Sequence, residues 1–263
     1  MWPAAEREQA RIALERARRC QQLAHEIAEN AAGMTRNPQA AQCAAYGHAR
    51  LFRQRCDLST SHFDLDLDGM LTRFAGDIIS AGTSQNIDAR AIAGAIAWEY
   101  EENLHGRYSD YLQYNDSAYE LDPDLRFGDG LGWASIHTAA AQEVLPTASS
   151  YELQCARMEA ASAISMIGVI MGDCARDYLD LSGGIWIGDQ PAVLALFFNT
   201  GRNLLTQSAA RRRLNACSPG MTVTLDISQN PMARWVSANL SRFAEFRTNP
   251  APPSGTYAQV IVE

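Results

Sequence analysis

The sequence contains no lysine, and this absence excludes several kinds of chemistry. All 22 residues counted as Lys or Arg are arginines. Schiff-base formation and lysine general-base catalysis are therefore excluded, because both need a primary amine. With 30 acidic residues the net charge is −8. An acidic surface argues against nucleic acid as the main partner, since phosphate binding needs a basic face.

Long hydrophobic runs are also missing. The most apolar stretch, residues 160–172, lies between Glu159 and Asp173. About 20 apolar residues are needed to cross a bilayer, so this stretch predicts a buried helix and no membrane span. The N-terminus has no basic region followed by an apolar one, which predicts synthesis in the cytoplasm without a signal peptide.

Metal-binding patterns are absent as well. The six cysteines show no metal-ligand spacing, so neither a metal nor another cofactor is expected. Residues 64–69 match the first half of a calcium-binding loop, but Ala75 stands at position 12, where such a loop needs Glu. The acidic run therefore favours the start of a helix.

Hydrophobic periodicity predicts a mainly α protein. The share of apolar residues is 47%, which is ordinary for a globular chain with a core. One expected helix carries Met70, Leu71, Phe74, Ile78 and Ile79 on one side. The other expected helices span about 4–31, 37–56, 88–103, 136–146, 151–183, 190–199 and 204–214.

The C-terminal part differs in kind. Residues 221–227 and 256–262 predict strands, and residues 231–246 between them predict a helix. The two strands could pair into a small sheet, which makes a β-α-β appendix. We therefore expect an N-terminal helical extension (1–62), a helical domain with a small β element (63–215) and this appendix (216–263).

One carboxylate stands out from the other acids. Residues 91–97 are apolar and lead to Trp98, Glu99 and Tyr100. Ile92 and Ile96 lie seven and three residues before Glu99, so its side chain is expected on or beside the buried helix face. A desolvated glutamate there could hold a proton near neutrality. The alternative is that Glu99 only begins a solvated acidic patch with Glu101 and Glu102.

Two further motifs follow along the chain. Residues 128–141 form a glycine-rich turn that enters a helix, but they lack the strand-first context of a dinucleotide or phosphate loop. Residues 194–201 form an apolar run that ends in Asn199, Thr200 and Gly201, a common way to end a helix. Each motif alone indicates only local structure.

In this order, the motifs resemble those of the lysozyme-like superfamily of goose-type lysozymes and soluble lytic transglycosylases. The corresponding stretches are 97–100, 132–136, 175–179 and 198–201, and the resemblance covers about residues 66–215. Tyr100, Ser135 and Phe198 replace the family's usual Ser, Gln and Tyr. The resemblance implies that residues 63–215 form a lysozyme-like helical domain.

The resemblance also implies an activity. Glu99 would protonate the β-1,4 bond between N-acetylmuramic acid and N-acetylglucosamine. A hydrolase would need a second carboxylate, for which Asp129 is the candidate and Asp122 and Asp124 are weaker ones, whereas a lytic transglycosylase would need none. The residues expected to contact the sugars are Tyr100, Tyr111, Tyr114, Ser135, Ile136, Phe198 and Asn199.

Peptidoglycan strands are the partner that this resemblance implies. A wall-cleaving enzyme without a signal peptide indicates an antibacterial toxin, exported by a machine such as the type VI system. It would act in the periplasm of a target cell and would have a cognate immunity protein. The alternatives are a phage endolysin, a chitin-directed hydrolase, or a catalytically inactive lysozyme-like protein that binds glycan or a partner.

Overall fold

A computed structural model of the chain describes residues 65–103, 130–148, 153, 156–157, 159–213, 222–253 and 259–263. The two N-terminal helices expected from the sequence lie outside these residues. The described part is mainly helical with a small parallel sheet, as expected. The chain divides into two compact units, Met1–Thr72 with Glu99–Met166, and Arg73–Trp98 with Ile167–Glu263. The three domains expected from the sequence stay a prediction.

The first described helices are α3 (Leu67–Arg73) and α4 (Ala75–Gln85). The Asp66 carboxylate accepts a hydrogen bond of 2.8 Å from the Gly69 N–H, which is how an acidic residue caps a helix. The prediction that this acidic run starts a helix is confirmed.

A break at Phe74 separates α3 from α4, where the periodicity predicted one helix. Phe74 has φ −109° and ψ 17°, which no α-helix continues through. Met70, Leu71, Phe74 and Ile78 are buried, but Ile79 is 38% exposed. Placing Ile79 on the apolar side was therefore wrong.

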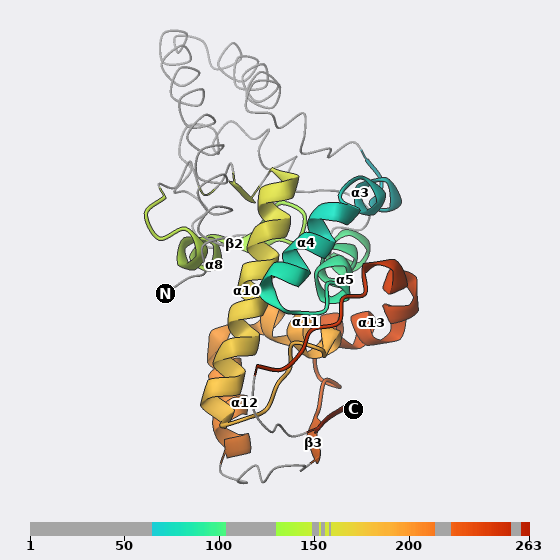
Figure 1. The fold of residues 1–263 in the computed structure, drawn as a ribbon. Coiled ribbons are helices and arrows are strands. Elements are labelled where there is room, and N and C mark those ends of the chain that lie inside the picture. The colour runs from blue at the N-terminus through green and yellow to red at the C-terminus, as the bar shows by residue number, and fades with distance from the viewer. Residues whose placement is uncertain are drawn as a thin grey trace, which may run out of the picture. The chain divides into compact units, whose positions relative to one another are not determined.

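Helix α5 (Arg90–Trp98) forms the centre of the second unit. All residues from Ala91 to Ala97 are buried, as expected of a helix that is apolar on every side. It is surrounded by α11 (Pro191–Thr200), α13 (Pro231–Asn239), α4 and the 3₁₀ helix η4 (Leu240–Phe246), and Figure 1 shows α11 and α13 beside it.

Glycine allows the closest of these approaches. A Cβ atom added to Gly94 would lie 3.0 Å from both methyl groups of Val236 on α13. The C-terminal helix therefore packs directly on α5 and contributes to the core of the second unit.

The two C-terminal strands pair as expected. Strands β3 (Thr222–Leu225) and β4 (Gln259–Val262) are parallel, with Thr222 opposite Gln259 and Leu225 opposite Val262. Parallel strands need a crossover, which α13 and η4 supply, so the β-α-β prediction is confirmed. The single helix expected over 231–246 is α13 followed by η4.

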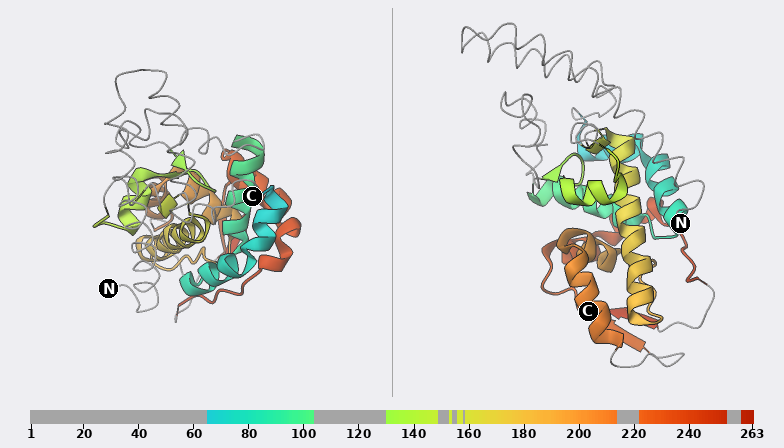
Figure 2. Two further views of the ribbon diagram at one scale, coloured as in Figure 1. Left: turned by 90° about the horizontal axis from the view of Figure 1, so that it is seen from above. Right: turned by 90° about the vertical axis from the view of Figure 1, so that its left-hand side faces the viewer.

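In the first unit a short antiparallel hairpin precedes helix α8 (Thr138–Val144). Strand β1 (Gly130–Leu131) pairs with β2 (Ile136–His137); Figure 2 shows the hairpin beside α8. The expectation that the helix begins at Ile136 was wrong by two residues, because Ile136 and His137 pair in the strand.

Helix α10 (Ala160–Ser182) is the longest described helix. Its predicted end is confirmed: Gly183 has φ 74° and donates to the Leu179 carbonyl at 3.0 Å. The single helix expected over 151–183 is interrupted by a bend at Glu159, before which residues 153, 156 and 157 are helical; the expected start near residue 151 lies outside the described residues. No helix in the described part of the chain is both long and apolar enough to cross a membrane.

Candidate active site

Glu99 lies where α5 changes into a π-helix. The π-helix η2 spans Glu99–Asn103 and continues α5 directly. Glu99 is only 4% exposed, whereas Glu102 is exposed. The predicted burial of Glu99 is therefore confirmed, and Glu99 does not belong to a solvated patch. Short π-helical turns of this kind occur frequently at functional sites.

Burial bears on the charge of Glu99. A buried carboxylate loses the hydration that it has in water, and this loss disfavours the ionised form unless hydrogen bonds replace it.

The glycine-rich motif forms a tight hairpin. Gly132 has φ 75° and Ser135 has φ 51°, and the Ser135 N–H donates to the Gly132 carbonyl at 3.1 Å. A Cβ atom on Gly130 would overlap the Ser135 Oγ and lie 2.5 Å from its carbonyl oxygen. Gly130 is thus required by the fold of the hairpin. Ser135 is half-buried and Ile136 is 1% exposed.

A buried arginine holds this hairpin. Arg157 is 2% exposed, and its Nη1 donates to the Ile136 carbonyl at 2.9 Å. Its Nε donates to the Leu153 carbonyl at 3.3 Å. Arg157 was missed by sequence reasoning. Leu153, Ala156 and Ala160 are buried at the spacing of one helix face, and Arg157 falls on that face, which is the signal that could have revealed it.

Three charged side chains are buried in the described part of the first unit: Glu99, Arg157 and Glu159. Glu159 caps α10, because its carboxylate oxygens accept from the N–H groups of Ala161 at 3.3 Å and Ser162 at 2.7 Å. The positive end of a helix favours the ionised carboxylate there. Glu159 therefore has a structural role at the start of α10.

The predicted sugar contacts fall in different places. Tyr100, half-buried on η2, lies in the same compact unit as Ser135 and Ile136. Phe198 and Asn199 belong to the second unit, at the end of α11. Their predicted contacts, and those of Tyr100, Ser135 and Ile136, stay predictions.

Asn199 joins two elements of its own unit. Its Oδ1 accepts a hydrogen bond of 2.9 Å from the Nδ2 of Asn230. The Oδ1 of Asn230 in turn accepts from the Ala233 N–H at 2.8 Å and caps α13. The predicted end of α11 is confirmed by Gly201, which has φ 80° and donates to the Phe197 carbonyl at 2.9 Å.

Other predicted site residues lie outside the described residues: Asp122, Asp124, Asp129, Tyr111 and Tyr114. Within the described residues no group of three His, Cys, Asp or Glu side chains could hold a metal ion. Comparison with known proteins finds no protein family, no curated protein and no solved structure that matches the chain. The lysozyme-like resemblance therefore depends on the motifs of this sequence alone.

Proposed function

We propose that the protein is a peptidoglycan muramidase with a lysozyme-like catalytic domain and with Glu99 as its acid. The observation that supports this proposal best is the burial of Glu99, 4% exposed, at the point where an apolar helix becomes a π-helix. A general acid must hold its proton until the substrate arrives, and burial favours that state.

In the proposed reaction Glu99 gives its proton to the glycosidic oxygen as the bond to C1 of N-acetylmuramic acid breaks. The sugar passes through an oxocarbenium-like state, and Glu99 is left as the carboxylate. Water then adds to C1 and loses its proton to a second carboxylate, for which Asp129 is the candidate. In a lytic transglycosylase the muramic 6-hydroxyl adds to C1 instead, loses its proton to the Glu99 carboxylate and forms a 1,6-anhydro product.

The test is a cleavage assay on purified peptidoglycan, with the soluble products identified by mass spectrometry. We expect the wild type to release muropeptides and Glu99→Gln to be slower by about 10²- to 10⁴-fold. Glu102→Gln is the matched control, because Glu102 is exposed on the same π-helix, and it should retain activity. Products with or without one added water distinguish hydrolysis from transglycosylation.

The same assay decides between this proposal and its alternatives. Binding of peptidoglycan by the wild type without any product would refute the enzyme and support a glycan-binding protein. Cleavage of chitin in preference to peptidoglycan would support a chitin-directed hydrolase.

We further propose that the muramidase is an antibacterial toxin that acts in the periplasm. Growth should stop when the chain is sent to the periplasm of a test bacterium and continue when it stays in the cytoplasm. The Glu99→Gln variant should be harmless in both places. Equal toxicity in the two compartments would contradict the proposal, and co-expression of a neighbouring gene product that restores growth would identify the immunity protein.

A further inference from the structure

A pocket of about 530 Å³ opens on the second unit, and Glu99 is not among its residues. Its apolar floor is made by α11 and the end of β3, and α12 (Arg202–Arg213) forms one side. The volume falls within the range of about 300–1,000 Å³ that is usual for small-molecule sites. The lining residues are Val193, Leu196, Phe197, Leu204, Ser208, Arg211, Leu225, Asp226, Ile227 and Gln229.

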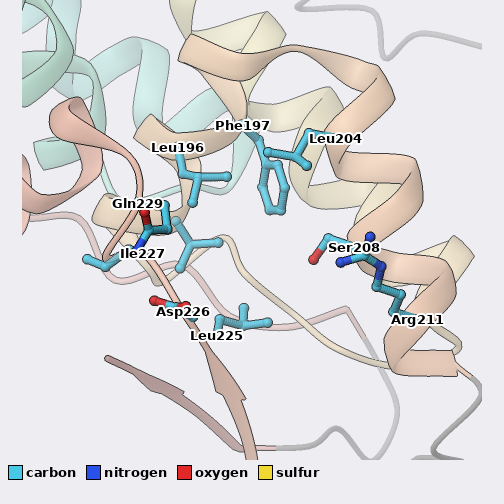
Figure 3. A pocket seen from close by; sticks show the side chains of 10 residues that line it. Leu196, Phe197, Leu204, Ser208, Arg211, Leu225, Asp226, Ile227 and Gln229 are labelled. Carbon is cyan, nitrogen blue, oxygen red and sulfur yellow. The ribbon is translucent and has the colours of Figure 1, made fainter.

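The pocket carries opposite charges on its two sides. Figure 3 shows Arg211 reaching in from α12 and Asp226 on the other side, at the end of β3, with the ring of Phe197 between these elements. Both charged residues are exposed. Within the described residues Arg211 forms no ion pair, so its guanidinium is available to a carboxylate.

Hydrogen bonds from Ser228 stabilise the ionised form of Asp226. Its Oδ1 accepts the N–H of Ser228 at 2.8 Å. Hydrogen bonds from the Ser228 side chain and backbone lower the pKa of the Asp226 carboxyl group below its ordinary value. The carboxylate thus keeps its negative charge at neutral pH and can attract an ammonium group.

Neutral polar groups complete the pocket. The Ser208 hydroxyl lies 3.1 Å from the Tyr178 hydroxyl, and since a hydroxyl can both donate and accept, it can form a further bond. Gln229 adds an amide. The pocket thus combines an apolar floor with a cation at Arg211, an anion at Asp226 and polar groups that can pair with an amide. This combination matches a short peptide that has an ammonium at one end and a carboxylate at the other.

We propose that this pocket binds a short apolar peptide with free termini, whose carboxylate pairs with Arg211 and whose ammonium pairs with Asp226. The apolar side chains of the peptide rest on Leu196, Phe197 and Leu204. A fatty acid fits less well, because it offers nothing to Asp226. This proposal is argued from the second unit alone and does not depend on glycan cleavage.

Isothermal titration of the full chain with di-, tri- and tetraleucine tests the proposal. At least one length should bind, and acetylating its amine or amidating its carboxylate should weaken binding by up to about 5-fold, as expected for the loss of an exposed ion pair. Triserine should not bind, because it lacks the apolar side chains. Absence of binding by all three leucine peptides would overturn the proposal.

Variants locate the site. Arg211→Gln should weaken binding as amidation does, and Asp226→Asn, which keeps the Oδ1 acceptor for Ser228, should weaken it as acetylation does. Leu204→Ser should reduce affinity without unfolding the chain, since Leu204 is 39% exposed. The matched controls Arg234→Gln and Asp180→Asn, at exposed positions outside the pocket, should bind like the wild type.

Two results separate this site from the proposed active site. Glu99→Gln should bind the peptide normally whether or not the chain cleaves peptidoglycan. If Arg211→Gln and Asp226→Asn bind as tightly as the wild type, the peptide lies elsewhere and the proposal is wrong. Tight binding of laurate that Arg211→Gln abolishes, with no binding of any leucine peptide, would replace the peptide by a fatty acid.

Discussion

Two glycines of helix α4 should respond in opposite directions to the same substitution. Gly82 faces Ala89, the residue before α5, and a Cβ atom added to Gly82 would lie 2.5 Å from the Ala89 Cβ and 2.9 Å from its Cα. Carbon atoms normally pack at about 3.5–4.0 Å. Because a backbone atom is involved, no side-chain rotation can relieve the contact, and the turn into α5 must move.

The sign of each effect follows from two magnitudes. Replacing Gly by Ala in a helix stabilises it by about 0.5–1 kcal/mol, while overpacking a well-packed site costs about 1–3 kcal/mol. Gly82→Ala should therefore lower the free energy of unfolding by up to about 2.5 kcal/mol. Gly76→Ala is the control: Gly76 is exposed and has nothing within 4 Å of an added Cβ, so it should stabilise by up to about 1 kcal/mol.

Urea unfolding followed by far-ultraviolet circular dichroism measures both variants on the full chain. The expected result is that the urea midpoint falls for Gly82→Ala and rises slightly for Gly76→Ala. If both substitutions stabilise equally, α4 does not approach Ala89 closely and the packing that sets the start of α5 is wrong. If both destabilise, the assignment of Gly76 to an open helix surface is wrong.

The other predictions concern three single sites. Gly130→Ala should lower the free energy of unfolding by about 1–3 kcal/mol, because its Cβ would overlap Ser135; urea titration measures this. Asp88→Asn should lower the free energy of unfolding by about 1.5–3 kcal/mol in the same assay, since the buried Asp88 carboxylate pairs with the Arg90 guanidinium at 2.6 Å. Burial raises the pKa of Asp177 above its ordinary 3.8, so the folded chain binds this proton more tightly than the unfolded chain, and its contribution to stability falls as the pH rises through 3.8 and the folded pKa. Asp177→Asn should therefore gain stability relative to the wild type from pH 3 to pH 6 in paired urea titrations.

Three results would contradict these predictions. An unchanged urea midpoint for Gly130→Ala would mean that Gly130 does not lie close to Ser135. If Asp88→Asn lowers the free energy of unfolding no more than the exposed control Asp180→Asn does, the ion pair between Asp88 and Arg90 contributes little to stability. A stability difference for Asp177→Asn that stays constant or shrinks with rising pH would mean that its pKa is not raised.

Element types were predictable from the sequence where the pattern is local. The end of α10 at Gly183, the end of α11 at Gly201 and the β-α-β order of β3, α13 and β4 follow from glycine, capping and alternation rules, which depend on neighbours in the chain. The breaks at Phe74 and Glu159 were not predictable, because both interrupt an apolar periodicity that continues past them. Only the backbone geometry at Phe74 and the capping bonds of Glu159 reveal them.

The candidate site was likewise predictable only where the sequence pattern is local. The spacing of Ile92, Ile96 and Glu99 indicated a buried carboxylate, and Glu99 is 4% exposed. The spacing did not indicate the π-helix that begins at Glu99, since helix type depends on which carbonyl each N–H reaches. The structural role of Arg157 was also missed, because its guanidinium donates a hydrogen bond to a carbonyl of the hairpin, 21 residues away in the chain.

The sequence alone thus determined that the chain is mainly helical, lysine-free and acidic, and that Glu99 lies on an apolar helix face. These properties depend on composition and on spacing within one helix. Only the tertiary structure decided that α13 packs on α5 through Gly94, that Arg157 holds the hairpin, and that Arg211 and Asp226 share a pocket. Those facts require residues from distant parts of the chain to meet, and no local pattern records which ones will.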